Sequence, residues 1–498
     1  MKKLSDLLEG IDYRLLQGDI DDTEITDLVY DSRKATEGCL FVCVTGANFD
    51  GHTFASAVAD VGARAIVVTK PVDVRSDVAV IKVEDTREAL ALLSAAWFGH
   101  PAEKLSVIGI TGTKGKTTTT YMIKSILENA GYKVGLIGTI ETIIGDEHIP
   151  SANTTPESYT IQDYMSRMVE ASITVCVMEV SSQGLMLHRV DGIPFEIGIF
   201  TNISPDHIGK NEHASFEEYL HCKSLLFQKC KKGILNADDP HTKDILTDHT
   251  CEVETYGFSD KADYQALDVK LVNSDGKLGV SYRVKGEVDL AVEIGMPGTF
   301  SVYNSLAAIA VCHHFHVEAN DVKKALLNAK VRGRIEAYPV SRDYTVLIDY
   351  AHNAMALESL LTTLRDYEPG RLVTLFGCGG NRSKERRFEM GEVSGKLSDF
   401  TIITSDNPRF EEPDAIMADI ETGMKKTDGK YVKIRDREEA IRYALEHAEK
   451  GDCIVIAGKG HEDYQEIKGK KYHMDERELI QQAMEDLGIA VPGSAQAN

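Results

Sequence analysis

The fold class of this chain follows from the stretch LSVIGITGTKGKTT, residues 105–118. Its apolar first half predicts a buried strand over 105–111, and the residues from about Lys116 to Ala130 predict a helix that stops at Gly131. A second apolar strand is expected over 134–138. A strand, a glycine-rich turn, a helix and a further strand form a βαβ unit, which is typical of a parallel sheet covered by helices.

The turn over 112–118 is a predicted phosphate-binding loop, because backbone N–H groups and the positive end of a helix dipole can hold phosphates at such a junction. We expect Lys116 to reach the β- and γ-phosphates of ATP and Thr117 to place its hydroxyl on Mg²⁺. The usual G-x-x-x-x-G-K-[ST] spacing is not met, since Ile110 stands where the first glycine belongs, and a shortened loop is therefore predicted. A plain glycine-rich turn is the alternative. The remaining residues expected at the nucleotide are Gly112, Thr113, Lys114, Gly115 and Thr118.

Composition excludes several classes of function. The chain has 498 residues, with 55 lysines and arginines against 78 aspartates and glutamates, and a net charge of −23. Such a balance argues against nucleic acid as a partner. No window approaches the ~18 continuous apolar residues of a membrane span, and the N-terminus lacks the apolar segment of a secretory signal. The nine cysteines are scattered, which fits reduced thiols better than a disulfide framework.

The length predicts about three domains. Changes of pattern place them at 1–100, 101–333 and 334–498, because the alternation of strands and helices restarts after Arg334. Strands are expected over 174–180 and 196–200 in the second domain, and over 345–349, 372–376, 400–404 and 453–457 in the third. The expected architecture is α/β: a small N-terminal α/β domain, a central parallel-sheet domain that carries the phosphate loop, and a C-terminal Rossmann-like domain.

Two strand ends of the central domain carry candidate ligands. Glu179 closes an apolar strand, where open α/β sheets bind ligands, and is a candidate metal ligand. His207 follows the next strand and a turn, although spacing alone favours a structural histidine over a ligand. Lys223 looks, from spacing alone, like a lysine on a helix surface.

Four polar clusters follow predicted strands of the third domain, over 349–353, 377–382, 405–409 and 458–462. Each one alone is an ordinary turn. The carboxyl ends of parallel strands converge on one edge of a sheet, so the clusters are expected to meet there. An Asp, a Glu and two Arg together favour recognition of a zwitterion, since Arg binds carboxylates and carboxylates accept from an ammonium group.

These motifs, in this order, resemble the Mur ligase family, whose members form amide bonds in peptidoglycan precursors with ATP. The resemblance covers nearly the whole chain. It is carried by Asp31-Ser32-Arg33 and Asp50-Gly51-His52 in the first domain, by the short phosphate loop, and by Asn153-Thr154-Thr155, Glu179-Val180-Ser181-Ser182 and His188-Arg189 in the second.

The resemblance implies roles for residues that spacing alone does not assign. It implies that Lys223 is carboxylated by CO₂ and binds the metal with Thr117, Glu179 and His207, so that Lys116, Lys223, His207 and Glu179 are the catalytic residues. The UDP-linked substrate is expected at Ser32, Asn153, Thr154, Thr155, Ser181 and Arg189. The nucleotide is expected to contact Asn304, Arg334, Asp349 and His352 as well.

The Asp406-Asn407-Pro408-Arg409 pattern resembles members that add meso-diaminopimelate, with Arg382, Gly458 and Glu462 completing the pocket. The implied activity is an ATP-dependent ligation of diaminopimelate to UDP-N-acetylmuramoyl-L-alanyl-D-glutamate by a cytoplasmic monomer. A lysine-adding or folylpolyglutamate-type ligase and a P-loop ATPase used as a switch are the rivals. The family pattern is not followed at Leu187, Asn381 and Arg387-Phe388.

Overall fold

The computed structural model of the protein describes residues 1–46, 49–205, 208–209, 212–274 and 277–490. The chain forms two compact units, Met1–Asp263 with Ala307–Val317, and Tyr264–Leu306 with Glu318–Asn498. This division does not follow the boundaries expected at 100 and 333, which remain predictions. Within the described ranges no helix is both long enough and apolar enough to cross a membrane.

The first unit begins with a small sheet in the order β2-β7-β6-β5-β4. Strand β2 is antiparallel to β7 and the other neighbours are parallel. Helix α3 is capped at its N-terminus by Asp85, whose side chain accepts hydrogen bonds from two backbone N–H groups, and at its C-terminus by Gly99 in the left-handed region. The bounds are β2 Arg14–Gln17, β4 Leu28–Val29, β5 Leu40–Val42, β6 Ala65–Val68, β7 Ala79–Lys82, α2 Ala55–Val61 and α3 Thr86–Phe98, with α1 Leu4–Leu7 and the pair β1 Lys2–Lys3 and β3 Glu24–Ile25 beside them.

A larger sheet of the first unit has the order β11-β10-β9-β12-β8-β13-β14-β15. Its strands from β9 to β15 are parallel, as the apolar runs predicted. The central strand β8 lies between β12 and β13, so three strand ends meet around the residue that follows β8. The bounds are β8 Ser106–Thr111, β9 Val134–Ile137, β10 Glu141–Ile144, β11 Glu147–Pro150, β12 Val175–Glu179, β13 Phe195–Phe200, β14 Cys230–Asn236 and β15 Glu252–Gly257.

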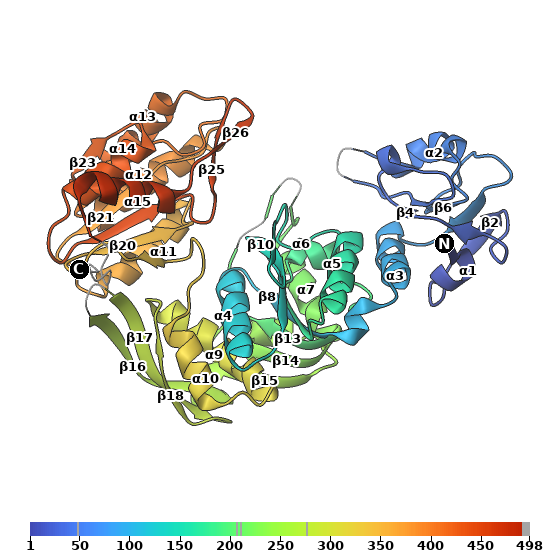
Figure 1. Cartoon of the computed structure of the whole chain (residues 1–498), viewed down its shortest axis with the longest axis horizontal. Coiled ribbons are helices and arrows are strands. Elements are labelled where there is room, and N and C mark those ends of the chain that lie inside the picture. The colour runs from blue at the N-terminus through green and yellow to red at the C-terminus, as the bar shows by residue number, and fades with distance from the viewer. Residues whose placement is uncertain (47–48, 206–207, 210–211, 275–276, 491–498) are drawn as a thin grey trace, which may run out of the picture. The chain divides into compact units, whose positions relative to one another are not determined.

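The helices of this unit cover the larger sheet (Figure 1). Apolar side chains of α5 and α7 join β12 and β13 in one buried cluster, while α4 packs on β8, β9 and β12. The predicted phosphate-loop helix is thereby confirmed. The bounds are α4 Lys116–Asn129, α5 Ser158–Glu170, α6 Ser182–Met186, α7 Phe216–Ser224 and α8 Thr242–Ile245. Helix α9, Thr299–His314, contributes residues to both units.

The second unit contains a sheet in the order β19-β20-β24-β21-β22-β23, parallel except for β19. The bounds are β19 Glu336–Tyr338, β20 Thr345–Asp349, β21 Leu372–Phe376, β22 Phe400–Ile403, β23 Tyr431–Lys433 and β24 Cys453–Ala457. The four strands predicted from apolar runs are thus confirmed, to within one residue at their ends. The antiparallel strands β16 Tyr264–Ser274, β17 Lys277–Gly286 and β18 Leu290–Ile294 belong to the same unit, with α10 Ala319–Leu327.

Two layers of helices enclose this second sheet (Figure 1). One apolar cluster contains side chains of α11, α12 and α13, and a second, on alternate residues of the strands, contains those of α14 and α15. Alternate residues of a strand point to opposite faces, so the helices cover both faces. The bounds are α11 Ala354–Arg365, α12 Lys384–Leu397, α13 Pro413–Met424, α14 Arg437–Glu446 and α15 Glu476–Leu487, and a hairpin of β25 Tyr464–Ile467 and β26 Lys470–His473 follows β24.

Candidate active site

The phosphate loop is held in shape by two glycines and by the end of β13. Gly112 has φ +146° and Gly115, which caps α4, has φ +89°. A Cβ on Gly112 would lie 1.9 Å from Thr201 Oγ1, so only glycine fits there. Asn202 accepts a hydrogen bond from Lys114 N at 3.0 Å and donates one to Lys114 O at 3.0 Å. The loop therefore has a fixed backbone, as a phosphate cradle requires.

Two lysines converge on this loop. Lys116 Nζ donates to Gly112 O at 2.8 Å, and Lys223 Nζ donates to the same oxygen at 3.0 Å. Lys223 is only 1% exposed and its ammonium group lies 4.5 Å from the ring centre of Tyr219. The reading of Lys223 as a helix-surface lysine, based on spacing alone, is thus wrong, because α7 turns this residue inward. Both side chains therefore lie against the loop where phosphates would bind.

Glu179 ends β12 beside the loop and is 1% exposed. Its Oε2 accepts hydrogen bonds from Thr117 Oγ1 at 3.0 Å and Thr139 Oγ1 at 2.9 Å, and its Oε1 accepts from Thr139 N at 2.8 Å. These three donors are neutral. Thr139 was not among the predicted site residues, although it stands two residues after β9, where the rule that ligands gather at strand ends could have found it.

The oxygen donors of this region suit Mg²⁺. Within the described part of the chain no three His, Cys, Asp or Glu side chains form a metal-binding group. Mg²⁺ does not need one, since it prefers oxygen ligands, keeps several waters and is bound through one or two carboxylates and the substrate phosphates. Thr117 and Glu179 supply a hydroxyl and a carboxylate within 3.0 Å of each other. Of the other two predicted ligands, Lys223 lies against the loop and His207 lies outside the described residues.

The segment predicted to bind the UDP-linked substrate packs directly on Glu179. Thr155 Oγ1 donates to Glu179 O at 3.0 Å and accepts from Ser181 N at 2.9 Å. Arg189 donates to Thr155 O at 3.0 Å, and its guanidinium lies 2.7 Å from Glu157. Strand β12 and the start of α6 thus hold this segment in place.

The other predicted substrate residues lie around this segment or in the N-terminal sheet region. Thr154 Oγ1 is 3.1 Å from Thr139 Oγ1, and Asn153 is exposed. Ser32 begins a short 3-10 helix, Ser32–Lys34, whose cap is the Asp31 side chain. The ring of Tyr30, two residues earlier, lies 5.9 Å from that of Tyr159 on α5.

In the second unit, the predicted nucleotide residues 334, 349 and 352 gather where β20 ends. Asp349 accepts hydrogen bonds from Ile335 N and Ala351 N, both at 2.8 Å, and burial raises the pKa of its carboxyl group although Arg334 acts in the opposite direction. The Arg334 guanidinium lies 4.8 Å from the ring centre of Tyr350. His352 Nδ1 is 2.9 Å from Tyr350 O. Asn304 is buried on a different element, helix α9.

The predicted amino-acid residues of the loops after β22 and β24 lie together. Gly458 has φ +111°, and a Cβ there would lie 2.9 Å from Asp406 Oδ2. Asn407 donates to Glu462 Oε2 at 2.9 Å. Arg409 donates to Glu466 Oε2 at 3.0 Å and to Gly380 O at 2.9 Å. The close packing of Gly380 against Pro408 O brings the loop after β21 to this edge as well.

Arg382 and two of the departures from the family pattern, Asn381 and Arg387, lie on that loop and on α12. Arg382 is exposed. Asn381 has φ +56° and its side chain accepts from Phe410 N at 3.2 Å, while its own N–H donates to Glu411 at 2.5 Å. Arg387, only 1% exposed, lies 2.7 Å from Glu411. Asparagine suits the left-handed backbone at position 381. Asn381 and Arg387 thus both contact the segment around Glu411 and help to hold the loop after β21 against the loop after β22.

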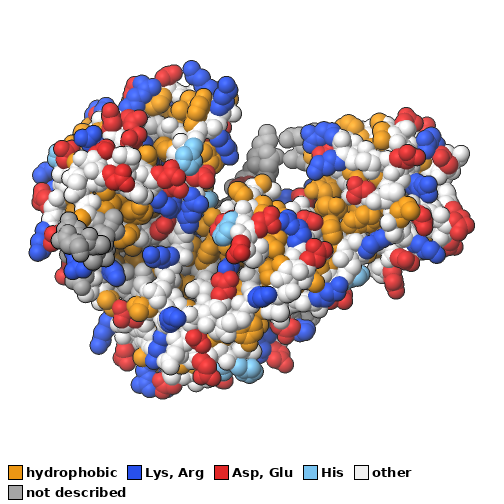
Figure 2. Space-filling model, in the orientation of Figure 1, with side chains coloured by type: hydrophobic (Ala, Val, Ile, Leu, Met, Phe, Trp, Pro, Cys, Tyr) orange, Lys and Arg blue, Asp and Glu red, His pale blue; other side chains and the backbone are white. Residues whose placement is uncertain are grey.

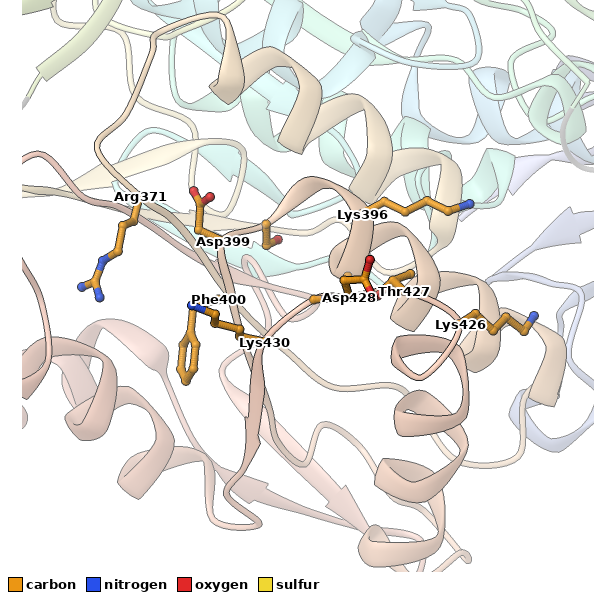
Figure 3. Close-up of a pocket in the computed structure, with 11 residues that line it drawn as sticks. Arg371, Lys396, Asp399, Phe400, Lys426, Thr427, Asp428 and Lys430 are labelled. Atoms are coloured by element: carbon orange, nitrogen blue, oxygen red, sulfur yellow. Dashed lines mark hydrogen bonds between the residues drawn. The ribbon is translucent and has the colours of Figure 1, made fainter.

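A solvent-open groove of about 740 Å³ lies away from these residues (Figure 3). Arg371, Phe400 and Lys430 line it, at or just before the first residues of β21, β22 and β23. It therefore lies at the amino ends of the strands, whereas ligands of open α/β sheets bind at the carboxyl ends. We assign it no part of the candidate site.

Comparison with known proteins gives matches along most of the chain. Residues 24–98 match the model described as Mur ligase family, catalytic domain, residues 110–312 the Mur ligase middle domain, and residues 333–460 the Mur ligase, glutamate ligase domain. A curated relative from Clostridium acetobutylicum, UDP-N-acetylmuramoyl-L-alanyl-D-glutamate--2,6-diaminopimelate ligase 1, is 44% identical over 97% of this chain and 100% of its own length.

Solved structures agree with these sequence matches. A structure of a UDP-N-acetylmuramoyl-L-alanyl-D-glutamate--2,6-diaminopimelate ligase has a TM-score of 0.73 at 27% identity, and the match covers 98% of this chain and 100% of that one. The MurF ligase from Thermotoga maritima, solved in complex with ADP, has a TM-score of 0.58 at 20% identity over 94% of this chain and 98% of that one. The second match shows a shared fold only.

Proposed function

This chain belongs to the Mur ligase family, and on that premise we propose that it is an ATP-dependent ligase that adds meso-2,6-diaminopimelate to the D-glutamate of UDP-N-acetylmuramoyl-L-alanyl-D-glutamate. The predicted three-domain α/β architecture and the predicted enzyme class agree with the relatives. The geometry that supports the ATP-dependent step best is the fixed phosphate loop, where Lys116 Nζ donates to Gly112 O and Thr117 contacts the buried Glu179 carboxylate.

In the proposed reaction the γ-carboxylate of the D-glutamate takes the γ-phosphoryl group of ATP, and the amine of diaminopimelate attacks the resulting acyl phosphate. Lys116 and the backbone N–H groups of the loop bind the phosphates and offset charge on the transferring group, which is the main protein contribution to such reactions. Phosphate leaves as the amide forms. No protein nucleophile is required.

Two further groups belong to the proposal. Thr117 and Glu179 would hold Mg²⁺, with His207 as a further ligand, and the ion when bound supplies positive charge to the phosphoryl group. Lys223 would carry a CO₂-derived carbamate, which replaces an ammonium by a carboxylate-like ligand. Its burial at 1% exposure supports the assignment, because the side chain is held in one position beside the phosphate loop, where a carbamate could reach the metal. Depleting CO₂ should lower turnover reversibly if the carbamate is needed.

The remaining assignments of substrate groups follow the same premise. The UDP-linked substrate would contact residues 32, 153–155, 181 and 189, and the nucleotide would contact residues 304, 334, 349 and 352. Arg409 would bind the carboxylate of diaminopimelate that lysine lacks. A guanidinium has five N–H donors, and Glu466 and Gly380 O each take one in this structure. We further propose that the protein is cytoplasmic and monomeric. Light scattering of the purified protein would test the monomeric state.

The test is phosphate release from ATP with Mg²⁺ and the UDP-muramoyl dipeptide, comparing meso-diaminopimelate with L-lysine, and with the product mass measured. We expect release with diaminopimelate and a much weaker response to lysine. Arg409→Ala should remove most of the diaminopimelate response. Equal turnover with both amino acids would contradict the selectivity, and ATP turnover that ignores the amino acid would indicate an ATPase switch instead.

A further inference from the structure

Lys459, in the loop after β24, is one of the most deeply buried charged side chains of the second unit. Its exposed fraction is 0%. It stands between Gly458 and Glu462, the two residues of that loop predicted to contact the amino acid. A buried ammonium group is costly unless it is paired and hydrogen-bonded, so its partners show what the residue is for.

The partners of Lys459 are two side chains of the amino-acid pocket. Its Nζ lies 3.1 Å from Asn407 Oδ1 and 3.0 Å from Glu462 Oε2. The same Glu462 oxygen accepts from Asn407 Nδ2 at 2.9 Å, and Asn407 Oδ1 also accepts from Glu466 N at 2.8 Å. Lys459, Asn407 and Glu462 therefore form a closed triangle of hydrogen bonds.

This triangle determines which groups the pocket can offer. Because Lys459 donates to Oδ1, the Asn407 amide is held with its nitrogen toward Glu462, and a second hydrogen remains on that nitrogen. Within the described residues both side-chain hydrogen bonds to Glu462 fall on Oε2, so Oε1 can accept from a ligand ammonium group. Lys459 also offsets the charge of Glu462, much as Glu466 offsets that of Arg409 at 3.0 Å.

We propose that Lys459 is a positioning residue that sets amino-acid selectivity: it orients Asn407 and Glu462 and balances the Glu462 charge, so that the pocket takes a neutral zwitterionic end and disfavours a lone ammonium group. This inference rests on the proposed function. Diaminopimelate ends in an ammonium and a carboxylate, which bring no net charge. Lysine ends in an ammonium alone, which is bound well only where a carboxylate is left unbalanced.

The test replaces Lys459 by methionine, which has a similar length and keeps apolar contact with the Tyr464 ring, 5.3 Å from the ammonium group in the wild type. We expect the KM for diaminopimelate to rise by about tenfold or more, as for loss of hydrogen bonds to a charged group, with the KM values for ATP and the UDP-dipeptide unchanged. Lysine turnover should increase, because Glu462 is now unbalanced. A double variant, Lys459→Met with Glu462→Gln, should lose that gain.

Lys471→Met is the matched control. Lys471 also lies over the Tyr464 ring, at 3.9 Å, but it is exposed and contacts neither Asn407 nor Glu462 in the described residues. It should leave both KM and selectivity unchanged. If Lys459→Met does not fold, Lys459→Gln tests the charge part, since it keeps an N–H donor and removes the charge; lysine turnover should again increase.

The outcomes separate this inference from the proposed function. If the wild type releases no phosphate with diaminopimelate, the proposed function fails. If the wild type is active and Lys459→Met keeps the wild-type preference for diaminopimelate over lysine, the role of Lys459 is refuted. A uniform loss of kcat with unchanged preference, in both Lys459 variants, would show a purely structural role and would also refute the inference.

Discussion

The first prediction concerns the stability contributed by Arg437, whose side chain contacts the residues at the ends of β22 and β24. Its guanidinium is 2.5 Å from Glu476, and the two side chains are 1% and 0% exposed. It also donates to Ser405 O at 3.0 Å and to Ala457 O at 2.9 Å. Arg437→Met removes the charge and these donors together, with little change in volume.

The expected cost follows from these contacts. Breaking one partner out of a buried ion pair costs about 3–5 kcal/mol, because the other charge stays buried without its partner. Burial already raises the pKa of Glu476, although Arg437 opposes this effect. In the variant the opposing charge is gone, so Glu476 takes up a proton more readily. An acid whose pKa is higher in the folded than in the unfolded state stabilises the fold as pH falls, so the deficit should shrink from pH 8 to pH 5.

The measurement must report on this sheet alone, because unfolding of a chain with two compact units is not a single transition. Hydrogen exchange of the amides of β22, β24 and α15, read by mass spectrometry, gives a local opening free energy. Arg435→Met is the control: its exposed pair with Asp414, at 2.9 Å, should be worth less than about 1 kcal/mol. A loss below about 1 kcal/mol for Arg437→Met, or one that grows as pH falls, would refute the reasoning.

Three shorter predictions concern the phosphate loop and the predicted amino-acid pocket. Glu179→Gln should cut phosphate release by about two orders of magnitude and raise the Mg²⁺ concentration needed, because a neutral amide is a weak ligand for a hard cation; a Mg²⁺ titration of turnover checks it. Gly112→Ala should weaken ATP binding at least about tenfold in calorimetry, since its Cβ meets Thr201 Oγ1 at 1.9 Å, and unchanged affinity would contradict the predicted site. Asn381→Asp places a second carboxylate beside Glu411, whose Oε1 accepts from the backbone N–H of residue 381 at 2.5 Å; the KM for diaminopimelate should rise a few-fold and recover in part at high salt.

The strands could be predicted from apolar runs in the sequence, whereas the positions and partners of the polar site residues could be seen only in the folded structure. The run Cys453–Ala457 is wholly buried, so hydrophobicity alone places that strand. Lys223 looked like a surface residue because periodicity cannot tell which helix face meets the phosphate loop. Lys459 was not predicted as a site residue, because it stands between Gly458 and Gly460 in a segment that reads as an ordinary turn.

Surface charge illustrates the same limit. On the face shown in Figure 2, acidic and basic side chains are interspersed. Composition gives only the sum of charges, however. The buried pairs such as Arg437 with Glu476 depend on side chains from separate helices that only the fold brings within 2.5 Å.

The two candidate edges differ in how their carboxylates are paired. At the phosphate loop, the side-chain donors to the buried Glu179 carboxylate are neutral threonine groups. A divalent cation fits such an arrangement, because it brings the positive charge that complements the carboxylate. A zwitterionic amino acid brings no net charge. At the amino-acid edge Lys459 and Arg409 have carboxylate partners within 3.0 Å, so selectivity there rests on balanced charges together with the direction of hydrogen bonds.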